Sequence, residues 1–155
     1  MSAKVQHRHG AWWLVQHRAG GRRMLRFGPK EADKKRAELL AGRLNALHEG
    51  PVGALYVYQM DRLLMVKVGW STSPARRLAS LEYSLPTKLE VAGRYVDVTQ
   101  RMERHLHQHL RRHRSRGEWY WPTKEFAQEL CANLQLLGLL RRGQPPPSLK
   151  FHAPR

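Results

Sequence analysis

The sequence has few acidic residues, a single cysteine and no long hydrophobic run. Its 155 residues contain 12 Asp and Glu against 28 Lys and Arg, which gives a net charge of +16. The single cysteine, Cys131, excludes an internal disulfide and a zinc site built from several cysteines, and its apolar helical surroundings favour packing. No stretch of about 18 apolar residues could cross a bilayer, and the first residues lack the apolar core of a secretory signal. These absences predict a cytoplasmic protein.

The excess of basic residues points to the class of partner. A charge of +16 attracts polyanions, so nucleic acid is the first expectation. An acidic membrane surface is the second, and the lack of a membrane-spanning run disfavours it. The length allows one ordinary domain or two small ones. Charge alone does not distinguish DNA from RNA.

The first third of the chain predicts a small basic unit. Residues 1–9 are polar and basic without periodicity, which predicts a disordered arm. Residues 10–49 predict a ββα unit, because two stretches of β-forming residues flank a Gly-Gly turn and a helical apolar pattern follows a proline. Residues 1–50 hold 11 Lys and Arg against four Asp and Glu. The alternative to DNA binding is a hairpin that packs on the second domain and is basic for solubility. The candidate contacts are Arg22, Arg23, Arg26, Lys34 and Lys35.

This unit resembles a known DNA-binding module. The resemblance is to the arm-type domain at the front of many tyrosine recombinases, over about 40 residues. It implies that the unit contributes affinity for DNA and takes no part in chemistry. The residues that carry it are Trp12-Trp13, Gly20-Gly21, Arg26-Phe27-Gly28 and Glu31-Ala32.

Residues 56–69 predict a tight β-hairpin, since two apolar runs flank a polar Asp-Arg turn. Tyr56 and Tyr58 lie two apart and therefore share one face of the first strand. Lys67 lies near the end of the second strand. A short amphipathic helix follows, with Arg76 and Arg77 in its first turn, where the helix dipole disfavours cations. A ligand role for these arginines is therefore more plausible than helix stabilisation.

The rest of the chain predicts one strand, two helices and a tail. A third strand over residues 88–96 leads to a helix from about 100 to 113, in which Glu103 and His107 lie one turn apart beside an apolar stripe. Arg111 and Arg112 add candidate nucleic-acid contacts, as does Arg76. A final helix follows Thr123. Residues 142–155, which include three consecutive prolines, predict a disordered tail.

Several of these motifs occur in the order typical of one nuclease superfamily. From about residue 53 to 137 the chain resembles the GIY-YIG superfamily, in particular its T5orf172 branch. The resemblance implies an α+β domain over residues 50–141, with a small antiparallel or mixed three-stranded sheet flanked by helices. The motifs are Tyr56-Val57-Tyr58, Lys67-Val68-Gly69, Ser71, Arg77, Glu103-x-x-x-His107 and Gly117-Glu118-Trp119-Tyr120.

The resemblance also implies a chemistry: an endonuclease that hydrolyses DNA with Mg²⁺ or Mn²⁺ and needs no small-molecule cofactor, in a bacterial or phage-infected cell. Glu103 would be the metal ligand and Tyr58 would help to activate water. Arg77 would neutralise the phosphate. Lys67 replaces the usual second tyrosine, which either lowers the pKa of a neighbouring phenol or weakens catalysis. One carboxylate suits Mg²⁺, which keeps most of its waters.

The sequence leaves several alternatives open. The chain could be an inactive GIY-YIG-fold DNA-binding protein, or an RNA-binding accessory protein. Tyr56 competes with Tyr58 for the role of the working tyrosine, and Asn133 is the one candidate for the family's late asparagine. His107 could orient Glu103 from a second layer. His105 and His109 lack a third partner at zinc-site spacing, which favours a solvated face.

Overall fold

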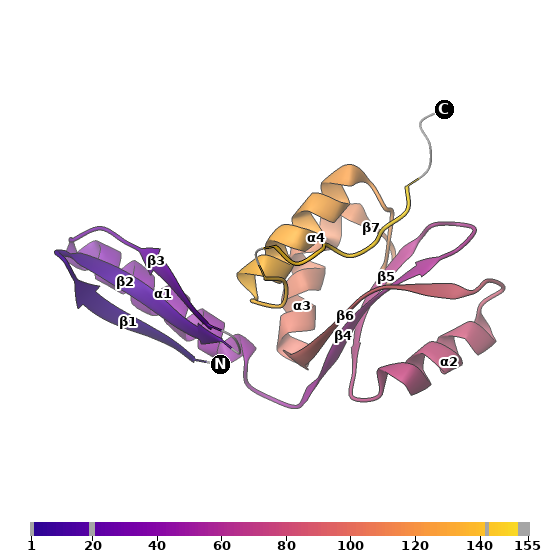
Figure 1. The fold of residues 1–155 in the computed structure, drawn as a ribbon, viewed down its shortest axis with the longest axis horizontal. Coiled ribbons are helices and arrows are strands. Elements are labelled where there is room, and N and C mark those ends of the chain that lie inside the picture. Colours follow the sequence, from indigo (N-terminus) through magenta and orange to yellow (C-terminus); the bar gives the residue numbers. More distant parts are fainter. Residues whose placement is uncertain (1, 19–20, 142, 152–155) are drawn as a thin grey trace. The chain divides into compact units, whose positions relative to one another are not determined.

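The computed structural model describes residues 2–18, 21–141 and 143–151, and Figure 1 shows the chain from end to end. Over these ranges the fold is α+β, with four α-helices and two antiparallel sheets. The chain divides into two compact units, residues 1–49 and 50–155. No helix in the described ranges is long and apolar enough to span a membrane.

The first unit is a three-stranded antiparallel sheet, in the order β1-β2-β3, packed on one helix. Its elements are β1 (Ser2–Arg8), β2 (Ala11–Arg18), β3 (Gly21–Arg26) and α1 (Glu31–Leu47).

The expectation of a disordered arm over residues 1–9 is wrong for the described residues, because Ser2–Arg8 form β1, and Met1 lies outside the described part. Ala3 and Val5 alternate with polar residues and pack into the core against α1. The side chain of Asn45 accepts a hydrogen bond from the Ala3 backbone N–H (2.7 Å) and donates one to its carbonyl (3.1 Å). His9 and Gly10 have positive φ angles of 49° and 70°, as a tight hairpin turn requires. The sequence of this segment is mainly polar, so it showed no strand pattern, although one face of the strand packs into the core.

The second unit is built on a five-stranded antiparallel sheet in the order β6-β4-β5-β8-β7. The sequence predicted three of these strands, which are the two strands of the hairpin and the strand that leads to Thr99. The two additional strands are too short to give a periodic signal. Its elements are β4 (Val52–Met60), β5 (Val66–Ser71), α2 (Pro74–Ser84), β6 (Leu89–Thr99), α3 (Gln100–His109), the 3₁₀ helix η1 (Leu110–His113), β7 (Arg114–Arg116), β8 (Trp119–Tyr120) and α4 (Lys124–Leu136).

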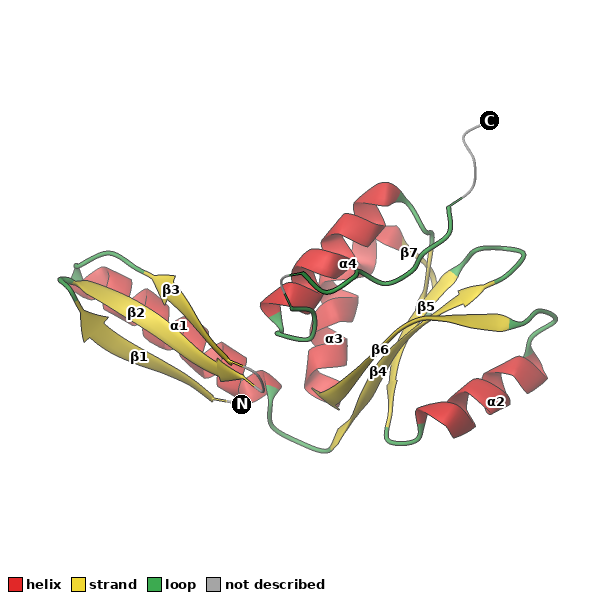
Figure 2. Cartoon of the chain, in the orientation of Figure 1, coloured by secondary structure: helices red, strands yellow, loops and turns green. Residues whose placement is uncertain are grey.

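Helices lie on both sides of this sheet, with α2 on one side and α3 and α4 on the other (Figure 2). Tyr56, Tyr58 and Met60 of β4 pack with Leu78 and Leu81 of α2. The buried apolar side chains of α3 and α4 form the opposite core: Met102, Leu106, Phe126, Leu130 and Leu134.

The tail expected to be disordered over residues 142–155 is ordered over part of its length. The buried side chain of Gln59 donates to the Lys150 carbonyl and accepts from the Lys150 N–H, both at 2.8 Å. The Ser148 N–H donates to the Ala92 carbonyl at 2.9 Å, and Lys150 Nζ lies 2.7 Å from a Glu90 oxygen. Three prolines favour an extended segment, and a buried amide holds that segment on the sheet. Residues 142 and 152–155 lie outside the described part.

Candidate active site

Glu103 lies in the first turn of α3 and reaches the edge of β5. Thr99 caps the helix, since its hydroxyl accepts the Met102 N–H at 3.3 Å. Met102 points into the core, so the next residue is turned about 100° toward the sheet edge. On β5, β8 pairs only with Val66 and Lys67, and the Glu118 carbonyl adds a bond at Val68, so this edge of β5 is open beyond Val68. There Glu103 Oε1 accepts the Trp70 backbone N–H at 2.9 Å, and the residue is only 8% exposed.

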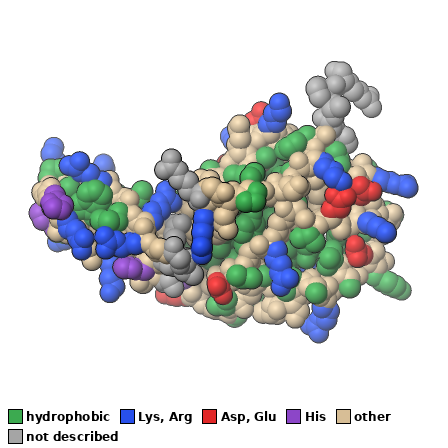
Figure 3. Space-filling view, viewed as in Figure 1, with side chains coloured by type: hydrophobic (Ala, Val, Ile, Leu, Met, Phe, Trp, Pro, Cys, Tyr) green, Lys and Arg blue, Asp and Glu red, His purple; other side chains and the backbone are tan. Residues whose placement is uncertain are grey.

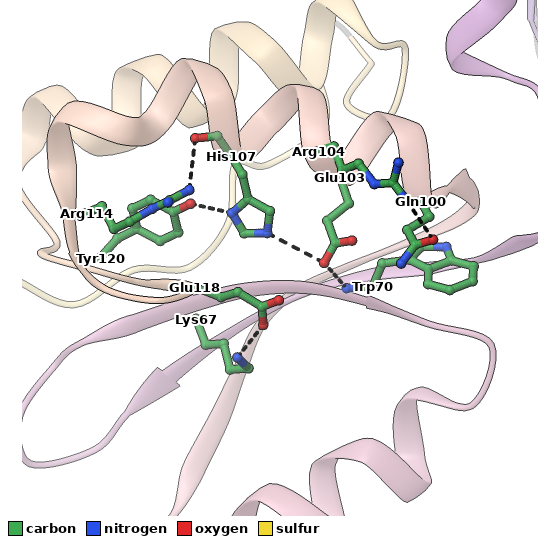
Figure 4. Close-up of polar contacts among 9 residues, drawn as sticks. All are labelled: Lys67, Trp70, Gln100, Glu103, Arg104, His107, Arg114, Glu118 and Tyr120. Atoms are coloured by element: carbon green, nitrogen blue, oxygen red, sulfur yellow. Dashed lines mark hydrogen bonds and ion pairs between the residues drawn. The ribbon is translucent and has the colours of Figure 1, made fainter.

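His107 lies one turn further along α3, and its two ring nitrogens face different partners. Nε2 lies 3.5 Å from Glu103 Oε1, and Nδ1 is hydrogen-bonded to the hydroxyl of the fully buried Tyr120. Burial raises the pKa of Tyr120, against an opposing hydrogen bond from Arg114. His107 Nε2 is buried and has no hydrogen-bond partner among the residues that the structure describes. Figure 4 shows Tyr120, His107 and Glu103 in a line above β5.

Glu118 enters the site from the turn between β7 and β8. Its carbonyl accepts the Val68 N–H at 3.3 Å, which fixes the turn against β5. Its carboxylate lies 2.6 Å from Lys67 Nζ, in an ion pair whose lysine side chain is 6% exposed. Burial raises the pKa of Glu118, but the hydrogen bond and the charge of Lys67 outweigh burial and leave this pKa below its ordinary value. Glu118 is therefore ionised at neutral pH.

These three side chains form a potential metal-ligand set. One ligand atom each from Glu103, His107 and Glu118 lies within 4.8 Å of the other two. Two carboxylates and one imidazole suit Mg²⁺ or Mn²⁺. Both are hard cations that prefer oxygen ligands, and Mn²⁺, as a transition metal, also accepts an imidazole nitrogen. The unpartnered Nε2 of His107 is consistent with this use. The residues present therefore fit a divalent cation.

The two tyrosines of β4 have different partners, although their rings stack 4.4 Å apart. The Tyr56 hydroxyl and the Arg77 guanidinium lie close enough to shift each other's pKa, whereas the Tyr58 hydroxyl donates to the Pro74 carbonyl at 3.2 Å. Tyr56 lies across Gly69, where a Cβ would collide with its ring. The charges of Glu118 and Glu103 help to raise the pKa of Tyr56, whereas the charge that raises the pKa of Tyr58 is that of Glu82.

Both phenols are held neutral by their surroundings. Burial raises the pKa of Tyr56, and the hydrogen bond and charge of Arg77 oppose this without cancelling it. Burial also raises the pKa of Tyr58, and the neighbouring Tyr56 adds to the shift. The expectation that Lys67 lowers the pKa of a neighbouring phenol is therefore wrong, because Lys67 is paired with Glu118 and both tyrosines lie in an apolar layer.

The structure brings Lys67, Arg77 and Glu103 of the sequence-based set to one end of the sheet, together with Tyr56. Sequence reasoning missed the place of Glu118 in this site. The Gly-Glu-Trp-Tyr motif was the available signal, but it did not show that the turn folds back on β5.

Other candidate residues lie away from this site. Asn133 is buried in α4 and donates to the Glu129 carbonyl at 2.9 Å, which is a bond within its own helix. His109 Nδ1 is bonded to the His105 carbonyl at 2.9 Å, and the described residues place no third metal ligand beside this pair. Arg112 is paired with Glu129 at 2.9 Å. Arg76 and Arg111 are exposed, and Cys131 is half-buried with a pKa raised by burial.

Comparison with known proteins matches the same region. Residues 53–135 match the T5orf172 domain, a GIY-YIG-related nuclease-like domain, and this span covers more than half of the 155 residues. The match does not include residues 10–49. The resemblance of that unit to recombinase arm domains therefore has no support. No curated protein and no solved structure matches the chain. With this match over the region that contains Tyr56, Arg77, Glu103 and Glu118, the chain belongs to the T5orf172 domain family.

Proposed function

We propose that this protein is a divalent-metal-dependent endonuclease that hydrolyses phosphodiester bonds in DNA. The observation that carries the proposal is the meeting of two sets of side chains at the open end of β5. One is the potential metal-ligand set of Glu103, His107 and Glu118. The other is the neighbouring pair of Tyr56 and Arg77, whose electrostatic interaction extends to Glu118. Phosphodiester hydrolysis needs a cation for the phosphate oxygens and an oriented water.

In this proposal the ligand set would hold Mg²⁺ or Mn²⁺, and the bound ion would act as a Lewis acid toward a phosphoryl oxygen. Tyr120 would position His107, because Nδ1–H donating to the Tyr120 oxygen would leave the Nε2 lone pair directed toward the carboxylates. Glu103 is oriented by the Trp70 N–H of β5. The sheet edge and α3 thus fix two ligands before any ion binds.

The remaining side chains would act on the DNA and on water. Arg77 lies beside the Tyr56 hydroxyl and would present a permanent positive charge to the phosphate. Tyr56 is neutral, so it would orient the attacking water by hydrogen bonding and would not act as a phenolate base. This role moves from Tyr58 to Tyr56, because the Tyr58 hydroxyl donates to a backbone carbonyl. Lys67 adds a cation beside Glu118.

A cleavage assay tests the proposal. Supercoiled plasmid is incubated with Mg²⁺ or Mn²⁺, and nicking by the wild type is compared with nicking by Glu103→Gln. Glu125→Gln is the matched control, since it removes one exposed carboxylate of the same unit far from the ligand set. We expect nicking by the wild type and the control, none in EDTA, and none by Glu103→Gln. Full nicking by Glu103→Gln would contradict the assignment.

A second candidate function is DNA binding without cleavage. It is favoured by Lys67, which replaces the tyrosine of the resembling nucleases and engages a ligand carboxylate at 2.6 Å. Such a close ion pair competes with a metal ion for Glu118. Retained DNA binding with no cleavage under any divalent metal would establish this alternative.

A further inference from the structure

The sheet of the first unit has one face that α1 does not cover. Side chains of a β-strand alternate between faces, and residues opposite each other on paired strands share a face. The row of Val5, Leu14 and Leu25 packs against α1. The alternate rows therefore lie on the outer face. They are Ser2, His17 and Arg22, then Lys4, Val15 and Met24, then Gln6, Trp13 and Arg26.

Charge is segregated between the sheet and the helix of this unit. Residues 1–30 contain seven Lys and Arg and no Asp or Glu, whereas all four acidic residues of the unit lie between Glu31 and Glu49. On the outer face the central strand presents Trp13 and Val15, which are partly and fully buried. The exposed cations lie on the two outer strands: Lys4 and Arg8 on β1, Arg22 and Arg26 on β3.

These four cations differ from those on the helix side. None of them has a carboxylate partner among the described residues of the chain. By contrast, Lys34 of α1 lies 3.4 Å from a Glu31 oxygen and 5.1 Å from the centre of the Trp12 ring. The strands lie in front of α1 in Figure 2, so Figure 3 looks onto the outer face, where blue basic side chains border green apolar ones.

We propose that this outer face, defined by Lys4, Arg8, Trp13, Arg22 and Arg26, binds duplex DNA in its major groove. Neighbouring strands lie about 4.8 Å apart, so the two outer strands are about 10 Å apart. The major groove is about 12 Å wide, with a phosphate chain along each side. The two rows of cations therefore match the two phosphate chains, and the partly exposed Trp13 of the central strand lies between these rows.

The geometry of this surface favours the binding of duplex DNA over that of other polyanions. The major groove of an RNA duplex is deep and narrow, so a sheet does not enter it. Single-stranded binding relies on exposed aromatic faces, whereas Trp13 is partly buried and its Nε1 donates to the Arg8 carbonyl at 3.1 Å. Arg23, Lys34 and Lys35 of the sequence-based set lie outside the outer face. The proposal concerns a surface separate from the ligand set of Glu103 and does not depend on cleavage.

The test compares two double variants of the full chain that remove the same charge. Arg22→Gln with Arg26→Gln alters the outer face, and Lys35→Gln with Arg36→Gln alters two exposed positions of α1. The Kd for a fluorescent DNA duplex is measured in EDTA over a range of salt concentrations. Each lost phosphate contact flattens the slope of log K against log salt by about 0.9. We expect a slope flatter by about 2 and a Kd weakened at least tenfold at 0.1 M salt for the first variant only.

Three results would overturn the proposal: equal losses in both variants, no loss in the outer-face variant, or a greater loss for single-stranded DNA or an RNA duplex than for duplex DNA. Thermal unfolding checks that each variant is folded, and Lys4→Gln with Arg8→Gln gives a second outer-face variant on the other outer strand. Because binding is measured in EDTA, the result stands whether or not the protein cleaves DNA.

Discussion

Removal of a single hydroxyl from either stacked tyrosine of β4 separates the two roles assigned to them. Tyr56→Phe removes the hydroxyl that interacts with the Arg77 guanidinium, whereas Tyr58→Phe removes a hydrogen bond to the Pro74 carbonyl. Both changes keep the ring, and therefore the stacking and the burial. The Tyr58 hydrogen bond is neutral and contributes about 0.5–1.5 kcal/mol. Tyr58→Phe should therefore lower the free energy of unfolding by about that amount, and Tyr56→Phe, whose hydroxyl interacts with the exposed Arg77, by no more.

The two variants should differ more in cleavage than in stability. Without its tyrosine partner, Arg77 is free to rotate away from the phosphate, and loss of one oriented donor at a developing charge costs about 3–4 kcal/mol in the transition state. This corresponds to roughly a hundredfold to a thousandfold loss of cleavage rate for Tyr56→Phe. Tyr58→Phe should stay within about tenfold of the wild type.

The assay is single-turnover cleavage of labelled duplex DNA with saturating enzyme, together with urea unfolding of each variant. Single-turnover conditions report the chemical step and not product release. If Tyr58→Phe loses as much cleavage as Tyr56→Phe, or more, the reassignment from Tyr58 to Tyr56 is refuted.

Three other predictions follow from contacts in the second unit. Tyr120→Phe should weaken Mn²⁺ binding about 10–100-fold by calorimetry, because His107 loses the partner that orients it; unchanged affinity would show that Tyr120 only packs. Gln59→Leu should speed hydrogen exchange at Ser148 and Lys150, whose segment the Gln59 amide holds; unchanged protection would contradict this anchoring role. The pKa of Glu118 lies below its ordinary value of 4.5, so its ion pair stabilises the fold above that pH and loses the effect as the pH falls through the folded pKa; Lys67→Met should therefore reduce the loss of stability on acidification, and an unchanged acid profile would refute this.

The hairpin and the helices were predictable because their signals are local. Alternating tyrosines, a polar turn and the stripe of α3 each lie within one element, so Lys67 and Glu103 could be placed on the correct elements. The two strands β7 and β8 have only three and two residues. Such short strands carry no periodic signal and exist because they pair with a neighbour, so the position of Glu118 beside Lys67 depends on a tertiary contact.

The choice between Tyr56 and Tyr58 could not be made from spacing, since both residues share one face of β4. It depends on which hydroxyl reaches Arg77 across the sheet, and on the absence of a side chain at Gly69. The two terminal segments were predicted as disordered for a related reason. Their sequences are polar or rich in proline, and the partners that order them, Asn45 and Gln59, are 42 and 91 residues away along the chain.

Titration of Mn²⁺ tests the central claim most directly, with the bound ion followed by electron paramagnetic resonance and DNA cleavage measured in the same samples. The account predicts one Mn²⁺ per wild-type chain, cleavage that rises with occupancy of that site, and loss of both in Glu103→Gln while DNA binding is retained. Cleavage in the presence of EDTA, or one Mn²⁺ bound at unchanged affinity by Glu103→Gln, would contradict it.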